Sequence, residues 1–240
     1  MAEQHWLERQ NALIGEEATA KLALAHVLLF GVGGVGSYAC EALARAGIGR
    51  LTLVDDDNVS LTNLNRQLIA TRSTLGQSKV EVAKMRIHDI NPDCQVTPLC
   101  VRATEENLPT LLDEIKPDFI LDAIDSVKAK VALAVWAKEH GVPLIASMGM
   151  GNKLDPTKIT LADLSKTEIC PLARAVRTRL KKHGILHLPV VFSRELPVKV
   201  EPSTPSSISF VPSVAGLMMA GYAVRSLITE GKGTEKIATE

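Results

Sequence analysis

Residues 26–57 read HVLLFGVGGVGSYACEALARAGIGRLTLVDDD. This stretch contains a short apolar run, a glycine-rich turn, small residues at helical spacing and a second apolar run at residues 50–54. Such a series predicts a strand, a tight turn, a helix and a second strand. The whole β-α-β unit spans about thirty residues, which is its usual length. We therefore expect two parallel strands joined by a right-handed crossover.

The rest of the chain repeats this alternation. It predicts further strands at residues 95–100, 118–122, 143–147, 158–162 and 207–211. It predicts helices at residues 76–90, before Pro117, at 126–139, from Pro171 and at 213–229. The alternation indicates an α/β fold, a doubly wound and mostly parallel sheet of the Rossmann-like nucleotide-binding type with a C-terminal extension. Residues 184–206 hold four prolines and little periodicity, which is typical of a functional loop.

We expect a single domain over residues 1–240, because one core can grow to this size. Residues 26–150 would form its nucleotide-binding core, residues 151–229 a substrate- or partner-facing part, and residues 230–240 a frayed tail. Apolar residues make up 46% and charged residues 22% of the chain, as in ordinary soluble proteins. Basic and acidic residues number 27 each, so the overall charge indicates neither nucleic acid nor a membrane as partner.

The N-terminus and the cysteines predict a cytoplasmic protein without zinc. Residues 1–10 lack the apolar core of a signal peptide. The four cysteines form no C-x-x-C pair, so we expect reduced thiols. Residues 207–228 approach the length and apolarity of a membrane span, but Pro212 and Arg225 interrupt them. We interpret this segment as core and expect no integral membrane span, with weak membrane contact by the helix at 213–229 left open.

The glycine turn is suited to approaching a phosphate. It contains Gly31, Gly33, Gly34 and Gly36 between a strand and a helix. Glycines let the backbone come close to a ligand, and the N-terminus of the following helix offers unpaired N–H groups and a positive dipole end. The turn therefore predicts anion binding, although a glycine turn alone does not distinguish a dinucleotide from a mononucleotide.

The polar residues after the second strand favour a nucleoside triphosphate. Asp55 ends that strand, where a carboxylate accepts hydrogen bonds from ribose hydroxyls, as it would in an NAD-dependent oxidoreductase. Asp57, Asn63, Arg66 and Gln67 then follow at the carboxyl edge of the sheet. A hydride-transfer site has no need of this cluster. Arg66 can bind phosphate oxygens through its guanidinium fork, Asn63 can hydrogen-bond to them, and Asp57 can ligate a divalent cation.

Two further segments reach the same edge. Lys79, at the start of the next helix, can place a point charge beside the phosphate on which negative charge develops. Asp125 follows the strand at 118–122 and is a second candidate ligand for Mg²⁺, with Ser126 beside it as a further nucleotide contact. We interpret Asp122 as a structural strand terminus.

Together these motifs resemble the MoeB/ThiF/HesA group of the ubiquitin-activating-enzyme-like superfamily. The resemblance spans about residues 9–150 through G-V-G-G-V-G-S, D-D-D, N-L-N-R-Q, G-Q-S-K and D-A-I-D. It implies an enzyme that adenylates a carboxylate with ATP and Mg²⁺ and releases pyrophosphate. The ATP ligands that it implies are Gly34, Asp55, Asn63, Arg66, Lys79 and Asp125. It also implies a homodimer in which Arg9 enters the ATP site of the other copy; the alternative is a solvated Arg9 in a first helical turn.

The second half resembles the tRNA threonylcarbamoyladenosine dehydratase branch of that group. The matching segments are S-M-G-M-G-N-K-L-D-P-T at 147–157, D-L-S-K-T at 163–167 and P-L-A-R at 171–174. The resemblance implies an ATP-dependent cyclising dehydration of threonylcarbamoyladenosine beside the anticodon of tRNA. The alternative is adenylation of the C-terminus of a small ubiquitin-like or sulfur-carrier protein, although the zinc-binding C-x-x-C pairs frequent in such relatives are missing here.

Residues 171–200 bear on both hypotheses. They contain seven basic residues and one acidic residue, a local excess that favours a phosphate backbone and hence tRNA. The alternative is a solvated helix face.

Cys170 precedes Pro171 at a helix start, where the helix dipole favours a thiolate. It is either a structural residue at the start of the helix or a thiol for a thioester or persulfide step with a sulfur-transfer or carrier protein.

Overall fold

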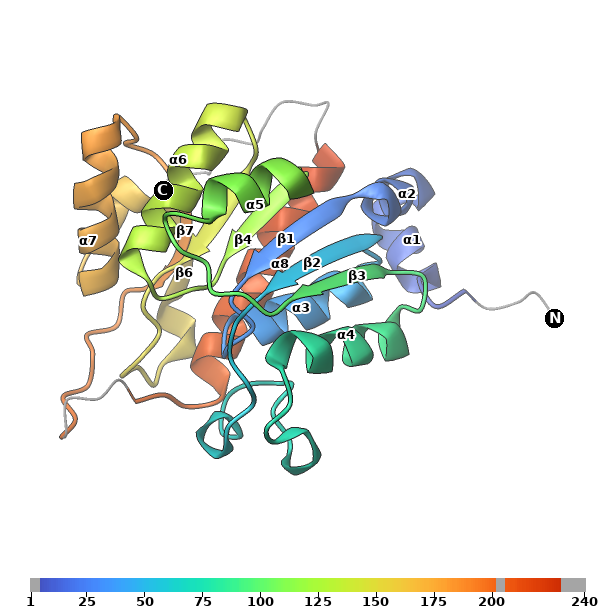
Figure 1. Ribbon diagram of the computed structural model, residues 1–240, viewed down its shortest axis with the longest axis horizontal. Coiled ribbons are helices and arrows are strands. Elements are labelled where there is room, and N and C mark those ends of the chain that lie inside the picture. The colour runs from blue at the N-terminus through green and yellow to red at the C-terminus, as the bar shows by residue number, and fades with distance from the viewer. Residues whose placement is uncertain (1–4, 202–205, 230–240) are drawn as a thin grey trace.

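The computed structural model of the protein describes residues 5–201 and 206–229. A seven-stranded sheet runs through its centre in the order β3-β2-β1-β4-β5-β7-β6 (Figure 1). Neighbouring strands are parallel except β6 and β7, which pair antiparallel at one edge. The strands are β1 (His26–Phe30), β2 (Arg50–Val54), β3 (Gln95–Leu99), β4 (Phe119–Asp122), β5 (Leu144–Ser147), β6 (Ile159–Asp163) and β7 (Pro189–Ser193).

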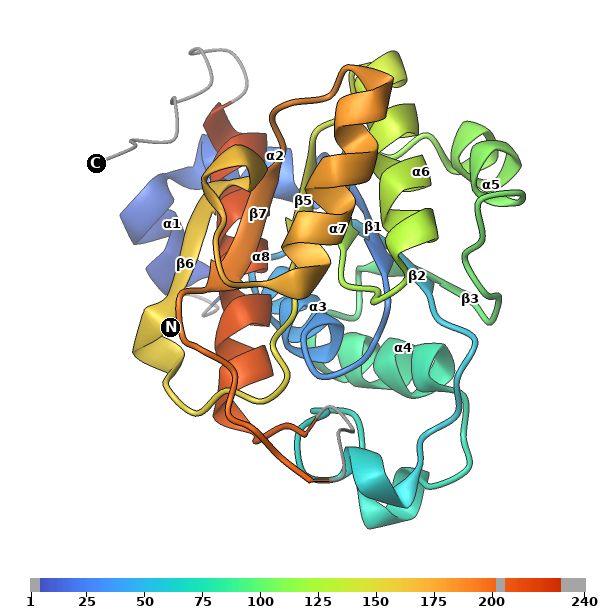
Figure 2. The same cartoon turned by 90° about the vertical axis from the view of Figure 1, so that its left-hand side faces the viewer.

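Helices cover both faces of this sheet. They are α1 (Glu8–Ile14), α2 (Glu16–Leu24), α3 (Gly36–Arg45), α4 (Lys79–Ile90), α5 (Leu108–Ile115), α6 (Val127–His140), α7 (Pro171–Leu180) and α8 (Phe210–Thr229). One face packs against α3, α4 and α8, and the other against α5, α6 and α7 (Figures 1 and 2). This is the three-layer arrangement that burial of both faces of a parallel sheet requires.

The central strand β1 explains why the two layers form. Val27, Leu28, Leu29 and Phe30 are all 0% exposed. Because successive strand residues point to opposite faces, Val27 and Leu29 join the core under α3, α4 and α8, whereas Leu28 and Phe30 join the core on the other side. Strand β1 therefore packs against both helix layers, and the glycine turn follows directly at its end.

The doubly wound fold is confirmed, but the strand predicted at residues 207–211 is wrong. Within the described residues 206–229, the chain is irregular until α8 begins at Phe210. Pro212 lies in the first turn of α8, where its missing N–H removes no helical hydrogen bond. The proline is thus part of the helix start and does not interrupt the apolar segment.

The prediction of an irregular loop at residues 184–206 is also wrong in part. It contains β7, whose Val190, Val191 and Phe192 are buried between β5 and β6. Proline at the first position of a strand costs no ladder hydrogen bond, so Pro189 does not prevent the strand. The sequence pattern does not predict helices α1 and α2. The tail predicted to fray at 230–240 lies outside the described residues.

Helix α8 is a core helix of the sheet. Among the described helices it alone is long and apolar enough to cross a membrane, and half of its apolar window is buried inside the protein. It crosses α3 so closely that a Cβ on Gly216 would lie 2.2 Å from the carbonyl oxygen of Val35. The glycine turn that leads into α3 therefore rests directly on the backbone of α8.

This contact predicts different effects for two alanine substitutions in α8. Gly216→Ala should lower the free energy of unfolding by about 1–3 kcal/mol, because the backbones must separate to admit the methyl group. Gly221→Ala, whose new Cβ would meet only the flexible end of Arg225 at 3.4 Å, should leave stability unchanged or raise it through helix propensity. Urea unfolding of both variants tests this. Equal losses would show that α8 does not press on α3.

Candidate active site

Two glycines of the turn are required by packing. Gly31 follows β1 with φ 84°, and a Cβ there would lie 2.8 Å from the carbonyl oxygen of Ala123. A Cβ on Gly36 would lie 1.7 Å from the carbonyl oxygen of Gly31. These positions let β1, the start of α3 and the chain after β4 converge at the carboxyl edge of the sheet.

The other two glycines of the turn, Gly33 and Gly34, differ in the space around them. A Cβ on Gly33 would meet nothing nearer than the amide nitrogen of Gln67 at 3.9 Å, so glycine is not needed there for packing. A Cβ on Gly34 would touch Pro212 at 3.2 Å and the Cγ atom of Arg66 at 3.5 Å. The N-cap residue of α3 makes no side-chain cap hydrogen bond. A partly buried turn followed by a helix N-terminus without a side-chain cap fits a phosphate group, because both leave N–H groups for an anion.

Asp55 holds the turn in shape. Its carboxylate accepts hydrogen bonds from the backbone N–H of Val32 at 2.6 Å and from that of Asp57 at 2.9 Å. Burial raises the pKa of Asp55, and the nearby Lys79 ammonium and these two N–H groups oppose that shift. The side chain thus ties the end of β2 to the glycine turn, and its contact with a ribose stays a prediction.

Lys79 and Asp57 form an ion pair beside this carboxylate. The ammonium of Lys79 lies 2.6 Å from Asp57 and 3.8 Å from Asp55. Lys79 is 4% exposed, and the side chain of Asp57 is 65% exposed. A buried ammonium needs a partner, and its present partner is at the surface and free to turn away. Phosphate oxygens can therefore replace Asp57 at Lys79 without leaving the amine unpaired.

The predicted contacts from residues 61–70 lie next to the turn. Asn63 is buried and accepts a hydrogen bond from the N–H of Ser60 through its side-chain oxygen, which shapes the short 3-10 helix that carries the loop. The guanidinium of Arg66 donates to the carbonyl of Thr62 and the side chain of Asn65, both at 2.9 Å. Its aliphatic part lies against Gly34. The guanidinium is thus held beside the turn by weak, exposed contacts that a phosphate can replace.

Gln67 faces the turn from the same loop. It is 7% exposed, its side-chain oxygen is buried, and that oxygen has no hydrogen-bond partner in the described part of the protein. An unpaired buried acceptor is costly, so this site fits a ligand that brings a donor. The loop itself is fastened to α3 by a hydrogen bond from the N–H of Leu68 to the hydroxyl of Ser37 at 3.1 Å.

The site residues predicted after β4, Asp125 and Ser126, lie at the same edge of the sheet, in the connection from β4 to α6. Ala123 packs against Gly31, and Asp125 follows as an exposed residue of the short connection to α6. Ser126 caps α6, since its hydroxyl accepts from the N–H of Ala129 at 3.4 Å. Asp122 is buried against Lys130 and does not reach the surface, in agreement with a structural role.

The acidic residues at this edge suit a divalent cation. Carboxylate oxygens of Asp55, Asp56 and Asp57 lie within 4.8 Å of one another. Oxygen ligands of this kind are those that Mg²⁺ uses together with substrate phosphates. A cation shared by Asp57 and Asp125 stays a prediction.

Arg9 does not belong to the site of its own chain. It is exposed on α1, and the next residue, Gln10, donates to the carbonyl of Ala46 at 3.0 Å. Ala46 is the C-cap of α3, at the opposite end of that helix from the glycine turn. The role predicted for Arg9 therefore requires a second copy of the chain.

Two asparagines that sequence reasoning missed frame the site. The backbone N–H of Asn152 donates to the carbonyl of Ser206, and its side-chain oxygen accepts from the N–H of Ser206. The carbonyl of Asn152 also accepts from the N–H of Val198, and Asn65 donates to the carbonyl of Ser207 at 2.9 Å. These bonds bring the segment before α8 across the carboxyl edge. The sequence gives little signal for these contacts: asparagine tolerates the positive φ of 59° that Asn152 adopts, but the residue type alone does not predict it.

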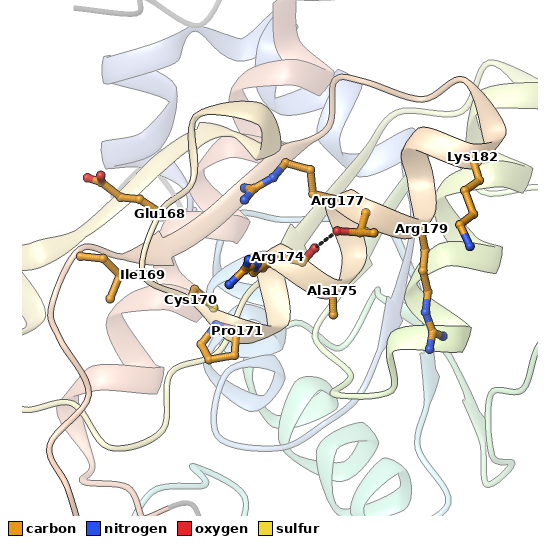
Figure 3. Close-up of a pocket in the computed structure, with 10 residues that line it drawn as sticks. Glu168, Ile169, Cys170, Pro171, Arg174, Ala175, Arg177, Arg179 and Lys182 are labelled. Atoms are coloured by element: carbon orange, nitrogen blue, oxygen red, sulfur yellow. Dashed lines mark hydrogen bonds between the residues drawn. The ribbon is translucent and has the colours of Figure 1, made fainter.

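A second surface feature lies over α7. A hollow of about 770 Å³ lies beside α7 and the turn that follows it. Figure 3 shows the side chains that line it, several of which are basic. Its basic residues are Arg174, Arg177, Arg179 and Lys182. Arg177 is already occupied, since its guanidinium donates to Leu164 and twice to Thr167. The other three basic side chains are exposed and available to an anionic partner.

Cys170 borders the hollow as the N-cap residue of α7. It is 6% exposed, and its sulfur accepts from the N–H of Ala173 at 3.5 Å. The sulfur also lies 3.5 Å from where a Cβ of Gly149 would be. This is the geometry of a structural N-cap, and it favours that interpretation over a reactive thiol.

Comparison with known proteins agrees with this geometry. The model of the ThiF family matches residues 7–240. This chain belongs to the ThiF family. The family predicted from the glycine turn and the polar motifs that follow it is therefore confirmed.

Three relatives show which kinds of ThiF-family protein this chain is similar to. The tRNA threonylcarbamoyladenosine dehydratase of Bacillus subtilis (strain 168) is 43% identical over 244 residues, covering 94% of this chain and 96% of its own. The crystal structure of Escherichia coli TcdA, a tRNA N6-threonylcarbamoyladenosine dehydratase in complex with ATP, has a TM-score of 0.88 at 36% identity and covers 97% of this chain and 100% of its own. The molybdopterin-synthase adenylyltransferase of E. coli (strain K12) is 36% identical over 157 residues, covering 65% of this chain and 62% of its own.

The open position of Gly33 predicts a variant that separates binding from folding. Gly33→Ala should leave the unfolding midpoint unchanged, since its methyl group has no near neighbour, yet weaken ATP binding at least about tenfold because it occupies the space of a phosphate. Titration calorimetry with ATP and urea unfolding measure the two effects. Unchanged ATP affinity would mean that the phosphates lie elsewhere.

Proposed function

We propose that the protein uses ATP to adenylate the carboxylate of threonylcarbamoyladenosine in tRNA and so drives its cyclisation with loss of one water. The match to dehydratases over nearly the full length of the chain supports this substrate. The gathering of Arg66, Lys79 and the glycine turn at one edge supports the use of ATP. The same substrates favour the cytoplasm as the place of action.

The reaction balances without a catalytic cysteine. A carboxylate oxygen attacks the α-phosphorus of ATP, and the bond to pyrophosphate breaks. A nucleophile within the same modified base then attacks the acyl carbon, and AMP leaves with that carboxylate oxygen. Since the nucleophile is already tethered to its target, proximity replaces an enzyme thiol. The structural position of Cys170 supports this route.

The residues of the chain supply position and charge. The N–H groups of the glycine turn and the start of α3 would hold phosphate oxygens, and Lys79 and Arg66 would stabilise the charge that develops as pyrophosphate leaves. Mg²⁺, when bound by Asp57 and Asp125, would neutralise part of the triphosphate charge. Asn63 and Gln67 would complete the contacts from their loop.

A homodimer would complete this arrangement with Arg9. The exposed apolar side chains of Leu13 on α1, Leu24 on α2 and Leu217 on α8 support association, with exposed fractions of 84%, 78% and 49%. Leu217 also lines an apolar hollow of about 330 Å³ between α8 and β6. In such a dimer Arg9 would serve the site of the other copy.

We further propose that α7 binds the phosphate backbone of the tRNA. Arg174 and Arg179 are exposed on α7 and Lys182 on the 3-10 turn Lys181–His183 that follows it, and α7 begins beside the loop that follows β5 at the carboxyl edge. A docked RNA backbone would therefore lie next to the ATP edge. Contacts of this kind position the substrate and do not read its sequence.

A second function remains in view because a carrier-type adenylyltransferase of the same family shares 36% identity with this chain. In that case the carboxylate would be the C-terminus of a small ubiquitin-like or sulfur-carrier protein. The two functions differ in the molecule that is adenylated, so one assay separates them.

The protein with ATP, Mg²⁺ and threonylcarbamoyl-modified tRNA should release AMP and pyrophosphate and leave the tRNA one water lighter by mass spectrometry. Arg66→Ala should lower kcat/KM by about 10²-fold or more, because the transition state loses a stabilising charge, with little change in the melting temperature. Unmodified tRNA is the control and should stay unchanged in mass. Adenylation of a carrier protein with no change in tRNA mass would favour the second function.

A combined Arg174→Glu, Arg179→Glu and Lys182→Glu variant should bind tRNA at least about tenfold more weakly. Its salt dependence should be shallower, by about one unit of slope for each phosphate group that the protein no longer neutralises. ATP affinity should stay unchanged. Lys116→Glu is a control for one charge reversal away from α7, because Lys116 is exposed just before β4 at the opposite edge of the sheet. Filter binding across a salt series gives both numbers, and an equal loss in the control would contradict the assignment of α7.

A further inference from the structure

A fully buried ion pair lies directly beneath the proposed ATP edge. The ammonium of Lys130 lies 2.9 Å from a carboxylate oxygen of Asp122 and 3.3 Å from its carbonyl oxygen. Both side chains are 1% exposed. The same carboxylate oxygen also accepts from the N–H of Ile124 at 3.2 Å. Three hydrogen bonds thus converge on one residue at the end of β4.

These bonds enclose a short connection. Asp122 is the last residue of β4, and Lys130 lies in the first turn of α6, where its own N–H donates to Ser126. The connecting segment, residues 123–126, carries Asp125. Lys130 therefore reaches back over this segment and fastens the start of α6 to the end of β4. We call this pair and its three hydrogen bonds the Asp122–Lys130 clamp.

The clamp is poorly explained by stability alone. Removing two charges from water is costly, and well-packed apolar residues of similar volume are often at least as stabilising. The second carboxylate oxygen of Asp122 is buried and has no hydrogen-bond partner in the described part of the protein, which adds to the cost. The other buried residues of α6 are apolar, so apolar packing is available at this face. An apolar pair could not form directional hydrogen bonds between the end of β4 and the start of α6.

The clamped segment also touches the glycine turn. The N–H of Ala123 donates to the carbonyl of Phe30 at 2.8 Å, and a Cβ on Gly31 would lie only 2.8 Å from the carbonyl oxygen of Ala123. A shift of residues 123–126 would therefore move either Asp125 or the turn. The clamp sets the distance between the phosphate-binding backbone and the exposed carboxylate next to it.

We propose that Asp122 and Lys130 are positioning residues that hold Asp125 in its working place at the ATP edge. This inference rests on the proposed function, because Asp125 has a task at this edge only if ATP binds there. The two residues act through Asp125 and do not touch the substrate. Their contribution is geometric, so it should disappear once Asp125 is removed.

A double variant, Asp122→Asn with Lys130→Met, removes the ion pair without leaving a lone buried charge. It should fold and bind ATP with affinity within about threefold of the parent, yet lower kcat at least about tenfold with little change in KM for tRNA. The single variant Lys130→Arg, which keeps a cation able to reach Asp122, should have a higher kcat than the double variant. In an Asp125→Ala background, the double variant should cause no further loss of kcat. Losses that multiply independently would overturn the proposal, since they would mean that the clamp acts by another route.

A second measurement does not depend on the reaction. Amide hydrogen exchange of residues 123–127 should be at least about tenfold faster in the double variant, whereas amides of β5 should exchange as in the parent. Unchanged exchange at residues 123–127 would overturn the clamp, even if the tRNA assay succeeds. If the parent protein does not act on tRNA but the exchange result holds, the clamp stands and the proposed substrate fails.

Discussion

The close approach of backbones at three glycines is the constraint on which the rest of the structure depends. Gly31 admits the carbonyl of Ala123, Gly36 admits the carbonyl of Gly31, and Gly216 admits the carbonyl of Val35. Any side chain at these positions would separate β1, β4, α3 or α8. Because the three contacts surround one turn, the fold brings the ends of its central strands and the start of α3 to a single point. Gly33, by contrast, has open space around it, and that space is where a ligand can approach.

The two cationic side chains at this edge have partners that a phosphate group can replace. Lys79 is buried but paired with the exposed Asp57, and Arg66 is held by contacts to a carbonyl and an amide oxygen at the surface. Both cations are therefore satisfied in the free protein, and both have partners that phosphate can displace at small cost. The Asp122–Lys130 pair at the end of β4 is the opposite case, since both of its members are buried and neither can leave.

The fold and most of the site follow from local sequence because they are local properties. The apolar run at 26–30, the glycines and the run at 50–54 each express one element, and parallel strands carry their terminal residues to one edge without further information. The positions of Asp55, Asp57, Asn63, Arg66 and Lys79 near this edge could be predicted for that reason. The roles of all five in binding ATP or Mg²⁺ remain predictions.

The misses have other causes. The apolar run Val190–Phe192 is itself typical of a short buried strand, but the prolines within 184–206 favour a loop, and only its place between β5 and β6 in the assembled sheet makes β7 evident. Helix α8 starts at Phe210 because its first turn packs on Gly34 through Pro212. The ties of Asn152 to the segment before α8 and the occupation of Arg177 by Thr167 are likewise contacts between distant parts of the chain. Such contacts are set by the assembled fold.

A crystal structure of the protein with ATP and Mg²⁺ tests the central claim most directly. We expect the triphosphate to lie over Gly33 and Gly34, with the guanidinium of Arg66 and the ammonium of Lys79 within hydrogen-bond distance of its oxygens. Lys79 should then have exchanged Asp57 for phosphate. A nucleotide bound over α7 or at another surface, with Lys79 still paired to Asp57, would contradict it.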